Sequence, residues 1–203
     1  MHRASPGSMA LVDFYNLEWY NDCTDKLEFL NSCCKSKRSI RTVNFVWYDY
    51  NPNTMNFVEK WLDESAVEST GLDEGFRAFY EYWVNQDGFV VGENFWCKVT
   101  FENDKPFAVI AFCQYESKII IMEVLIAPEK RGQGKGSKLL KELLSSEEII
   151  GFAIQKSEAV IYSSNIASQK AFEYAGFKYH HNHKDGNGDS MYYVYEGSSL
   201  STI

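Results

Sequence analysis

The stretch between residues 118 and 145 constrains the fold more than any other part of the chain. It begins with an apolar run over residues 119–126, whose many β-branched side chains are typical of a strand covered on both faces. Pro128 cannot donate to a β-ladder, so strand pairing should end there. Leucines then recur at helical spacing, at Leu139, Leu140, Leu143 and Leu144. This order predicts a buried strand, a loop and a helix.

The loop Arg131–Gly136 predicts a binding site for an anion. Its glycines alternate along the chain, at positions 132, 134 and 136, so a ligand can approach the backbone closely. The amides at the start of the following helix can then point at a phosphate group. Lys130, Arg131, Lys135 and Lys138 add positive charge here, although the whole chain has a net charge of −8. We therefore predict a phosphate or pyrophosphate site.

Two common nucleotide-binding motifs do not fit this loop. A Walker A loop needs a glycine five positions before Gly134, where the chain has Glu129, and Gly136 stands where serine or threonine is required. A dinucleotide-binding loop needs a third glycine where the chain has Ser137.

A second motif covers residues 165–177. Ser164 or Asn165 is a good N-cap for a helix, and Gly176 stands where a left-handed C-cap is needed. Phe177 supplies the hydrophobic contact that usually follows such a cap. A short strand over residues 159–162 precedes this helix. Taken alone, the pattern is also compatible with a capped helix in an unrelated α/β protein.

The two motifs together resemble the GNAT superfamily of N-acetyltransferases. Arg131-x-x-Gly134-x-Gly136 resembles the acetyl-CoA loop of that family, and Glu173-x-x-Gly176-Phe177 resembles the end of its later helix. The resemblance covers about residues 42–195. It implies an α/β (α+β) fold with a mixed, mostly antiparallel central sheet flanked by helices, preceded here by an extra N-terminal segment. Two neighbouring strands should diverge and hold the acyl-pantetheine arm between them.

The resemblance also implies acetyl-CoA as co-substrate and assigns residues to it. In the family the loop amides bind the pyrophosphate, the start of the later helix lines the CoA arm, and an amide at the end of the central strand stabilises the oxyanion. Carried over to this chain, the cofactor-binding residues are Leu125 or Ile126 for the oxyanion, with Arg131, Gly132, Gln133, Gly134, Lys135, Gly136, Ser137, Asn165 and Lys170.

Glu123 is the predicted catalytic base. Acyl transfer to an amine requires a neutral nitrogen, and Glu123 is the only charged residue in the apolar run over residues 119–126. Burial should raise the pKa of its carboxyl group toward a useful value. Two alternatives stay open. Glu123 pairs with a basic neighbour for structural reasons, or it binds the ammonium group while water acts as the base.

The proton donor for the departing thiolate is less clear from the sequence. Many members of the family place a tyrosine four residues before the glycine of the second motif, but this chain has Phe172 there. We predict Tyr162 as the substitute. The alternatives are that Tyr162 is a packed strand aromatic and that solvent protonates the thiolate.

Length and composition favour one domain. The 203 residues are 45% hydrophobic, which is enough for a substantial core. We interpret residues 1–9 as a tag or disordered segment and residues 10–203 as a single acetyltransferase domain. Within it, residues 10–90 form the N-terminal and acceptor-side part, residues 91–196 the acetyl-CoA-binding core and residues 197–203 a tail.

The predicted elements outside the two motifs follow hydrophobic periodicity and turn residues. They are helices at about 24–34, 57–62 and 72–84, strands at 42–50, 95–102, 107–114, 178–182 and 190–195, a turn at 116–117 and a loop at 182–189. Residues 145–156 either extend a helix or form an irregular insert.

Several classes of partner are disfavoured. The net charge of −8 argues against a general nucleic-acid binder. The chain shows no apolar stretch of transmembrane length and no signal-peptide core, so we expect a cytoplasmic protein without a membrane partner. The cysteines lack metal-ligand spacing, and adjacent His180 and His181 should face opposite sides of a strand. No metal is therefore predicted.

The sequence thus predicts an N-acetyltransferase that moves the acetyl group of acetyl-CoA to a primary amine of a small molecule or an amino terminus, by direct attack in a ternary complex. An acidic, aromatic acceptor pocket built by the first half of the chain would suit a polyamine or an aminoglycoside. Its candidate residues are Trp47, Tyr48, Asp49, Glu74, Phe76, Tyr80 and Trp83. The alternatives are a non-catalytic acyl-CoA-binding sensor or interaction module, and a nucleotide-binding regulator. Residues 10–40 either cover the acceptor site or form a homodimer contact.

Overall fold

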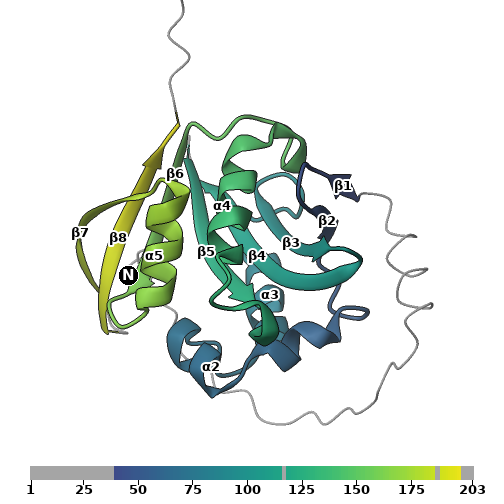
Figure 1. Ribbon diagram of the computed structural model, residues 1–203, viewed down its shortest axis with the longest axis horizontal. Helices are drawn as coiled ribbons and strands as arrows, with labels where there is room; N and C mark the ends of the chain where they lie inside the picture. Colours follow the sequence, from purple (N-terminus) through teal and green to yellow (C-terminus); the bar gives the residue numbers. More distant parts are fainter. Residues whose placement is uncertain (1–38, 116–117, 186–187, 198–203) are drawn as a thin grey trace, which may run out of the picture.

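The computed structural model describes residues 39–115, 118–185 and 188–197. An eight-stranded sheet in the order β1-β2-β3-β4-β5-β6-β8-β7 forms its centre (Figure 1). All neighbouring strands are antiparallel except β5 and β6, which are parallel. The strands are β1 (Ile40–Arg41), β2 (Val46–Asp49), β3 (Phe95–Glu102), β4 (Lys105–Tyr115), β5 (Lys118–Ile126), β6 (Lys156–Tyr162), β7 (Lys178–Asp185) and β8 (Gly188–Glu196). The predicted mixed, mostly antiparallel sheet is confirmed.

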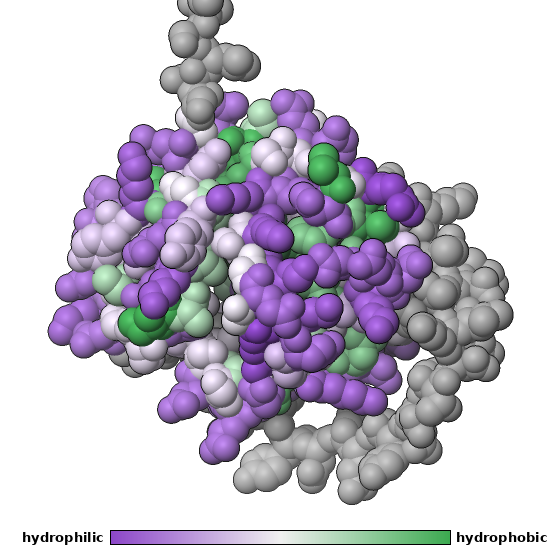
Figure 2. All heavy atoms as spheres, viewed as in Figure 1, coloured by the Kyte–Doolittle hydropathy of each residue, from purple (hydrophilic) through white to green (hydrophobic). Residues whose placement is uncertain are grey.

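Helices cover both faces of this sheet. The α-helices are α2 (Glu64–Thr70), α3 (Phe76–Val84), α4 (Lys135–Ser145) and α5 (Ile166–Ala175), and the 3₁₀ turns are η1 (Asn56–Trp61), η2 (Pro128–Lys130) and η3 (Glu147–Ile149). One hydrophobic core contains Leu139, Leu143 and Phe172 from α4 and α5. The other contains Phe76 and Phe79 from α3. The outer face over α4 and α5 is largely hydrophilic, as expected for helices whose apolar stripe faces the sheet (Figure 2).

The parallel strands β5 and β6 separate toward their carboxyl ends. Their pairing covers only three residue pairs, from Ile119 opposite Ser157 to Ile121 opposite Ala159. Both strands continue beyond this point, β5 to Ile126 and β6 to Tyr162. The predicted divergence of two neighbouring strands is therefore present in the structure.

A bulge lies in β5 where the separation begins. Ala111 of β4 is opposite Glu123 while Phe112 is opposite Ile121, so Met122 is the extra residue. A bulge bends its strand and increases the local twist. The carboxyl end of β5 is thereby redirected just where the two parallel strands part.

Helix α3 begins later than its apolar pattern predicts, at Phe76 rather than at Leu72. The backbone amides of Phe76 and Arg77 donate to the Glu59 carboxylate, at 3.0 and 2.6 Å, so a side chain from η1 caps this helix. Gly75 has φ +91°, and a β-carbon there would lie 2.6 Å from Glu59 Oε2. The cap therefore requires glycine before α3, which sets the start of the helix.

Other boundaries also differ from those predicted. The predicted helix at 57–62 is the 3₁₀ turn η1, and the short helix α2 was not predicted. The predicted loop at 182–189 was wrong, because β7 and β8 extend to within two residues of each other. Residues 145–156 contain η3 and then the start of β6. The helix predicted at about 24–34, the turn at 116–117 and nearly all of the predicted tail lie outside the described residues.

Candidate functional site

The glycine loop follows β5 and η2 and leads into α4. Gly132 and Gly134 both have φ +70°, a left-handed conformation that glycine adopts without strain. A β-carbon at Gly132 would meet no atom within 4 Å, so the backbone there is open to an incoming group. Gly134 is the N-cap of α4 and has no side chain to satisfy the amides of the first helical turn. The loop thus has the form of an anion site.

Several side chains around the loop bind other protein groups. Lys135 is hydrogen-bonded to Glu102 of β3, and Lys130 lies 4.0 Å from the same carboxylate. The Lys135 hydrogen bond holds the pKa of Glu102 below its ordinary value. Gln133 Nε2 donates to the Glu129 carbonyl and Ser137 Oγ to the Gly134 carbonyl, at 2.7 and 2.9 Å. These side chains are therefore engaged within the protein, and the backbone amides at the start of α4 are the candidate donors for an anion.

Gly136, unlike Gly132 and Gly134, faces another helix. A β-carbon at this position would lie 3.5 Å from Cβ of Ala171 in α5. This is an ordinary van der Waals distance, so Gly136 marks the contact between α4 and α5 and a small side chain would fit there. Because β5 and β6 run parallel, the loop after β5 and the N-terminus of α5 after β6 lie at the same edge of the sheet (Figure 1).

The second motif has the predicted caps. Asn165 Oδ1 accepts from the Ser168 amide at 3.0 Å, so Asn165 rather than Ser164 is the N-cap of α5. Gly176 is in the left-handed conformation, with φ +106°. The predicted aromatic contact is also present, since the rings of Phe172 and Phe177 lie 4.9 Å apart. Phe172 is buried in this core. Lys170, further along the helix, is exposed.

The Arg131 side chain binds protein groups on three sides. Its Nε donates to the Ile126 carbonyl at 3.0 Å and its Nη1 to Asp63 Oδ2 at 2.6 Å. Its Nη2 donates to the Trp61 carbonyl at 2.5 Å. The guanidinium group therefore joins the end of β5 to the segment that leads into α2.

Glu123 lies on the same side of the sheet as α3, because its partner Ala111 packs in the core there. Its side chain is partly buried, and Oε1 accepts from the Val124 amide at 2.9 Å. Burial raises the pKa of this carboxyl group to about 8, against a smaller opposite effect of the amide. Within the described parts of the chain, Glu123 has no ion pair, so the structural pairing with a basic neighbour is not seen there.

The directions of the backbone amides distinguish Leu125 from Ile126 as candidate donors to the oxyanion. The Ala127 amide donates to the carbonyl of Phe107 in β4, whereas the Val124 amide donates to the Glu123 carboxylate. Amides alternate in direction along a strand. The Leu125 amide therefore faces β4 and the Ile126 amide faces the gap between β5 and β6. This geometry favours Ile126 as the donor.

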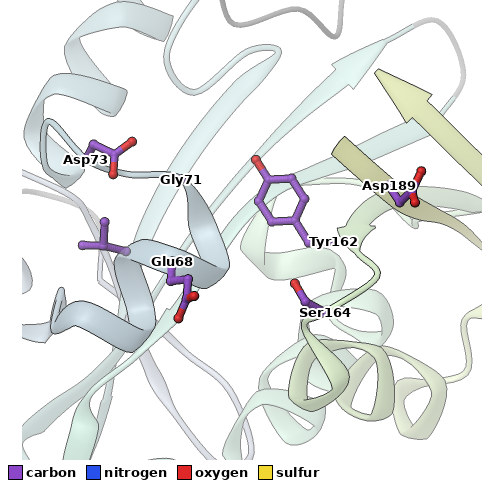
Figure 3. A pocket seen from close by; sticks show the side chains of 7 residues that line it. Glu68, Gly71, Asp73, Tyr162, Ser164 and Asp189 are labelled. Atoms are coloured by element: carbon purple, nitrogen blue, oxygen red, sulfur yellow. The ribbon is translucent and has the colours of Figure 1, made fainter. Parts of the chain in front are cut away.

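A pocket of about 330 Å³ lies beside the end of β6 (Figure 3). The Tyr162 ring projects into it toward Gly71, where a β-carbon would lie 3.2 Å from the tyrosine hydroxyl. Three carboxylates belong to its lining, which consists of Val67, Glu68, Gly71, Asp73, Tyr162, Ser164 and Asp189. Such a lining favours a ligand with positive charge.

The pocket differs from the one expected from the sequence. Of the aromatic candidates, Trp47 and Phe76 are fully buried in the two cores and cannot touch a ligand without rearrangement. Asp49 binds Lys98 at 2.6 Å. The acids that do line the pocket are Glu68, Asp73 and Asp189, which sequence reasoning missed. They come from distant segments of an acidic chain, and no motif distinguishes them.

The prediction that the two adjacent histidines face opposite sides of a strand was wrong. A bulge between Tyr179 and His181 adds a residue to the strand, and the Nδ1 atoms of His180 and His181 lie 2.7 Å apart. Among the described residues, no group of three or more histidine, cysteine, aspartate or glutamate side chains is arranged to hold a metal ion. None of the described helices has the length and hydrophobicity needed to span a membrane.

Comparison with known families accounts for this arrangement. The model of the acetyltransferase (GNAT) family matches residues 46–177, well over half of the chain. The chain belongs to this family. No curated protein matches it.

Solved structures with the GNAT fold match most of the chain at low sequence identity. One is AAC(6')-Ib in complex with paromomycin and acetyl-CoA, with TM-score 0.60 and 16% identity over 79% of this chain and 99% of that one. A spermidine N-acetyltransferase chimera from Vibrio cholerae and hSSAT has TM-score 0.57 and 13% identity, covering 75% and 95%. A ribosomal-protein alanine N-acetyltransferase from Escherichia coli has TM-score 0.55 and 15% identity, covering 78% and 98%. These likenesses establish the fold.

Proposed function

We propose that this GNAT protein transfers the acetyl group of acetyl-CoA to a primary amine of a small molecule or an amino terminus. The observation that carries the proposal is Glu123, a partly buried carboxyl group with a pKa raised to about 8, next to the point where β5 and β6 separate. Family membership and neighbours that are described as N-acetyltransferases support the same reaction.

The residues at the edge of the sheet fit acetyl-CoA, which supplies the acetyl thioester. The open backbone at Gly132 and the uncapped first turn of α4 suit the pyrophosphate group. The middle of α5 lies beside that turn, because Gly136 packs against Ala171, and the N-terminus of α5 lies at the same edge of the sheet as the loop. The Ile126 amide faces the gap between the strands, where it can donate to the oxygen that becomes negative during transfer.

Glu123 accepts a proton from the amine. A carboxylate whose pKa is about 8 is far more basic than an ordinary glutamate, so it can deprotonate a bound ammonium group near neutral pH. The neutral amine then attacks the acetyl group directly while both substrates are bound. If water is the base instead, Glu123 still binds the ammonium group before transfer.

The pocket beside Tyr162, whose lining does not include Glu123, holds the distal part of the acceptor. Glu68, Asp73 and Asp189 give it three carboxylates, which favour an acceptor with more than one amine, such as a polyamine or an aminoglycoside. The Tyr162 hydroxyl is directed into this pocket and is the proposed donor of a proton to the thiolate. Neighbours described with paromomycin and as a spermidine acetyltransferase support this acceptor class.

The test is CoA release from acetyl-CoA with a panel of amines that includes spermidine and kanamycin. We expect Glu123→Gln to lower kcat/KM by about 100-fold, the lower end of the usual contribution of a general base. Acetyl-CoA binding, measured by calorimetry, should stay unchanged. In the wild-type protein kcat/KM should rise with pH, reach half of its plateau near pH 8 and level off above that pH, because the carboxylate is the active form.

Glu147→Gln is the matched control, since Glu147 is an exposed glutamate of η3 outside the pocket. Retention of wild-type kcat/KM by Glu123→Gln would remove Glu123 from the reaction. Acetyl-CoA binding without CoA release for any amine would favour the acyl-CoA sensor instead.

A further inference from the structure

Helix α2 is attached at its N-terminus to the glycine loop. Asp63 is its N-cap, and Oδ1 accepts from the Ala66 amide at 2.9 Å. The other carboxylate oxygen accepts from Arg131 Nη1 at 2.6 Å. The hydrogen bond from the Ala66 amide lowers the pKa of Asp63 below its ordinary value, and Arg131 contributes a smaller lowering. One carboxylate thus connects the start of α2 with the loop after β5.

Arg131 extends this connection to two backbone carbonyls. Nη2 donates to Trp61, just before α2, and Nε donates to Ile126, the last residue of β5. A guanidinium group is planar and presents its donors in a fixed geometry, so it sets the relative positions of its three acceptors. Lysine, with one nitrogen on a flexible stem, cannot do so.

The other end of α2 is attached to the second motif. Asn165 Oδ1 caps α5, while its Nδ2 donates to the Ser69 carbonyl near the end of α2 at 3.2 Å. Arg131 and Asn165 are two of the residues that the family resemblance assigns to CoA. The Arg131 side chain binds the N-cap of α2, and the Asn165 side chain binds its last turn. A seven-residue helix is too short to be stable alone, so contacts of this kind determine where it lies.

Helix α2 also forms one wall of the acceptor pocket. Val67 and Glu68 lie in the helix and Gly71 is its C-cap, and all three line the pocket opposite Tyr162 and Ser164 (Figure 3). The wall of the acceptor pocket is thereby hydrogen-bonded to the two segments that flank the proposed CoA site.

We propose that Arg131 and Asn165 are positioning residues that couple the two sites through α2. Occupation of the glycine loop and the N-terminus of α5 by CoA orders α2, and the ordered helix raises affinity for the acceptor. By reciprocity, a bound acceptor strengthens CoA binding to the same degree. This inference rests on the proposed function, because it takes the pocket to be the acceptor site.

Two substitutions cut these connections and keep the helix caps. Asp63→Asn retains an oxygen that can cap α2 but removes the negative charge that Arg131 binds. Asn165→Ser retains a hydroxyl that can cap α5 but removes the donor to Ser69. The control is Arg77→Gln, which breaks an exposed arginine–glutamate ion pair within α3.

The first measurement is hydrogen–deuterium exchange of a peptide covering α2, with and without saturating CoA. Local opening determines this exchange, so CoA should slow it about fivefold or more in the wild-type protein and in Arg77→Gln. In Asp63→Asn and Asn165→Ser the slowing should be about twofold or less. Equal slowing in all four proteins, or none in the wild-type protein, would overturn the coupling.

The second measurement separates positioning from CoA binding. With spermidine as the acceptor, both variants should raise its KM about tenfold, a loss of about 1.4 kcal/mol. For Asp63→Asn, which changes no residue assigned to CoA, the acetyl-CoA Kd without acceptor should stay within about twofold. A large rise in acetyl-CoA Kd with unchanged acceptor KM would instead assign both residues to CoA alone. If no amine is acetylated, the proposed function fails, while the exchange experiment still decides the coupling.

Discussion

Glu123 shows how much one residue in a strand can reveal. Its position as the only charge in an apolar run predicted a raised pKa, and the structure gives a carboxyl group whose pKa is about 8. The bulge at Met122 could not be predicted, because the residues around it are those of an ordinary strand. The sequence therefore predicted the raised pKa of this carboxyl group but not the backbone geometry that surrounds it.

The raised pKa of Glu123 predicts a pH-dependent cost to stability. Since the folded protein binds this proton more tightly than the unfolded chain, the stabilisation is complete below about pH 4.5 and is lost as the pH rises through about 8. Glutamine has no charge to bury. We expect Glu123→Gln to raise Tm at pH 8.5 and to have a much smaller effect at pH 5, measured by thermal unfolding.

Glu147→Gln serves again as the control, because it replaces an exposed carboxylate and should show no such trend. The same Tm difference for Glu123→Gln at both pH values would mean that the carboxyl group titrates as in an unfolded chain. A gain in stability together with a loss of turnover would identify Glu123 as a residue retained for function at the expense of stability.

At the level of elements, the predictions for the glycine loop and for the helices after it agree with the structure, whereas α2 was not predicted. The motif around Gly134 combines a strand, a proline and alternating glycines. Few local structures are compatible with all three features, so the prediction was specific. Helix α2 has only seven residues, and its position depends on Arg131 and Asn165, which lie far away in the chain. Such contacts leave no periodic pattern in the sequence.

The contact between β3 and α4 predicts how charge near the loop affects CoA binding. Glu102 neutralises Lys135 and lies close to Lys130, so it competes with any anion for these cations. We expect Glu102→Gln to lower the CoA Kd about threefold at low salt, an effect of about 0.7 kcal/mol that is ordinary for a partly exposed pair. Calorimetric titration at low and high salt measures it.

The gain should disappear in about 0.5 M salt, where the screening length is only a few ångströms. Asp104→Asn, in the exposed hairpin next to β3, is the control for a general change in net charge. A weaker CoA affinity in Glu102→Gln would mean that the carboxylate holds Lys135 in a binding orientation.

At the level of the whole molecule, the sequence predicted the class of fold and one edge of the site. The proposed acceptor pocket was not predictable, because its lining comes from segments around residues 68, 162 and 189, which only the finished fold brings together. Buried aromatic residues such as Trp47 were plausible pocket residues in the sequence alone, since core and pocket aromatics look alike there.

The overall charge predicts that the KM values of the two substrates respond to salt to different degrees. The chain carries a net charge of −8, and three carboxylates line the pocket, so a polycationic acceptor is attracted and its attraction is screened by salt. We expect the KM of spermidine to rise several-fold between about 20 and 300 mM salt. The KM of acetyl-CoA should change less, because the acidic surface repels this anion while the loop attracts it.

A monoamine acceptor provides the internal comparison, and its KM should depend less on salt than that of spermidine. Parallel salt dependence of the two amines would show that the carboxylates of the pocket do not contact the distal charges of the acceptor.

The short parallel pairing of β5 with β6 also makes the molecule divisible. Strands β1 to β5 with α2, α3 and α4 form one piece, and β6, β7 and β8 with α5 form the other. Among the described residues, three strand pairs, the Ser157 hydrogen bond to Ile119, the Lys118–Glu158 ion pair, the Asn165 hydrogen bond to Ser69 and the packing of α4 on α5 join the pieces. A chain severed near residue 152 would give complementary fragments. Because CoA would contact both fragments, CoA binding would promote their association, as a ligand does in a split-protein reporter.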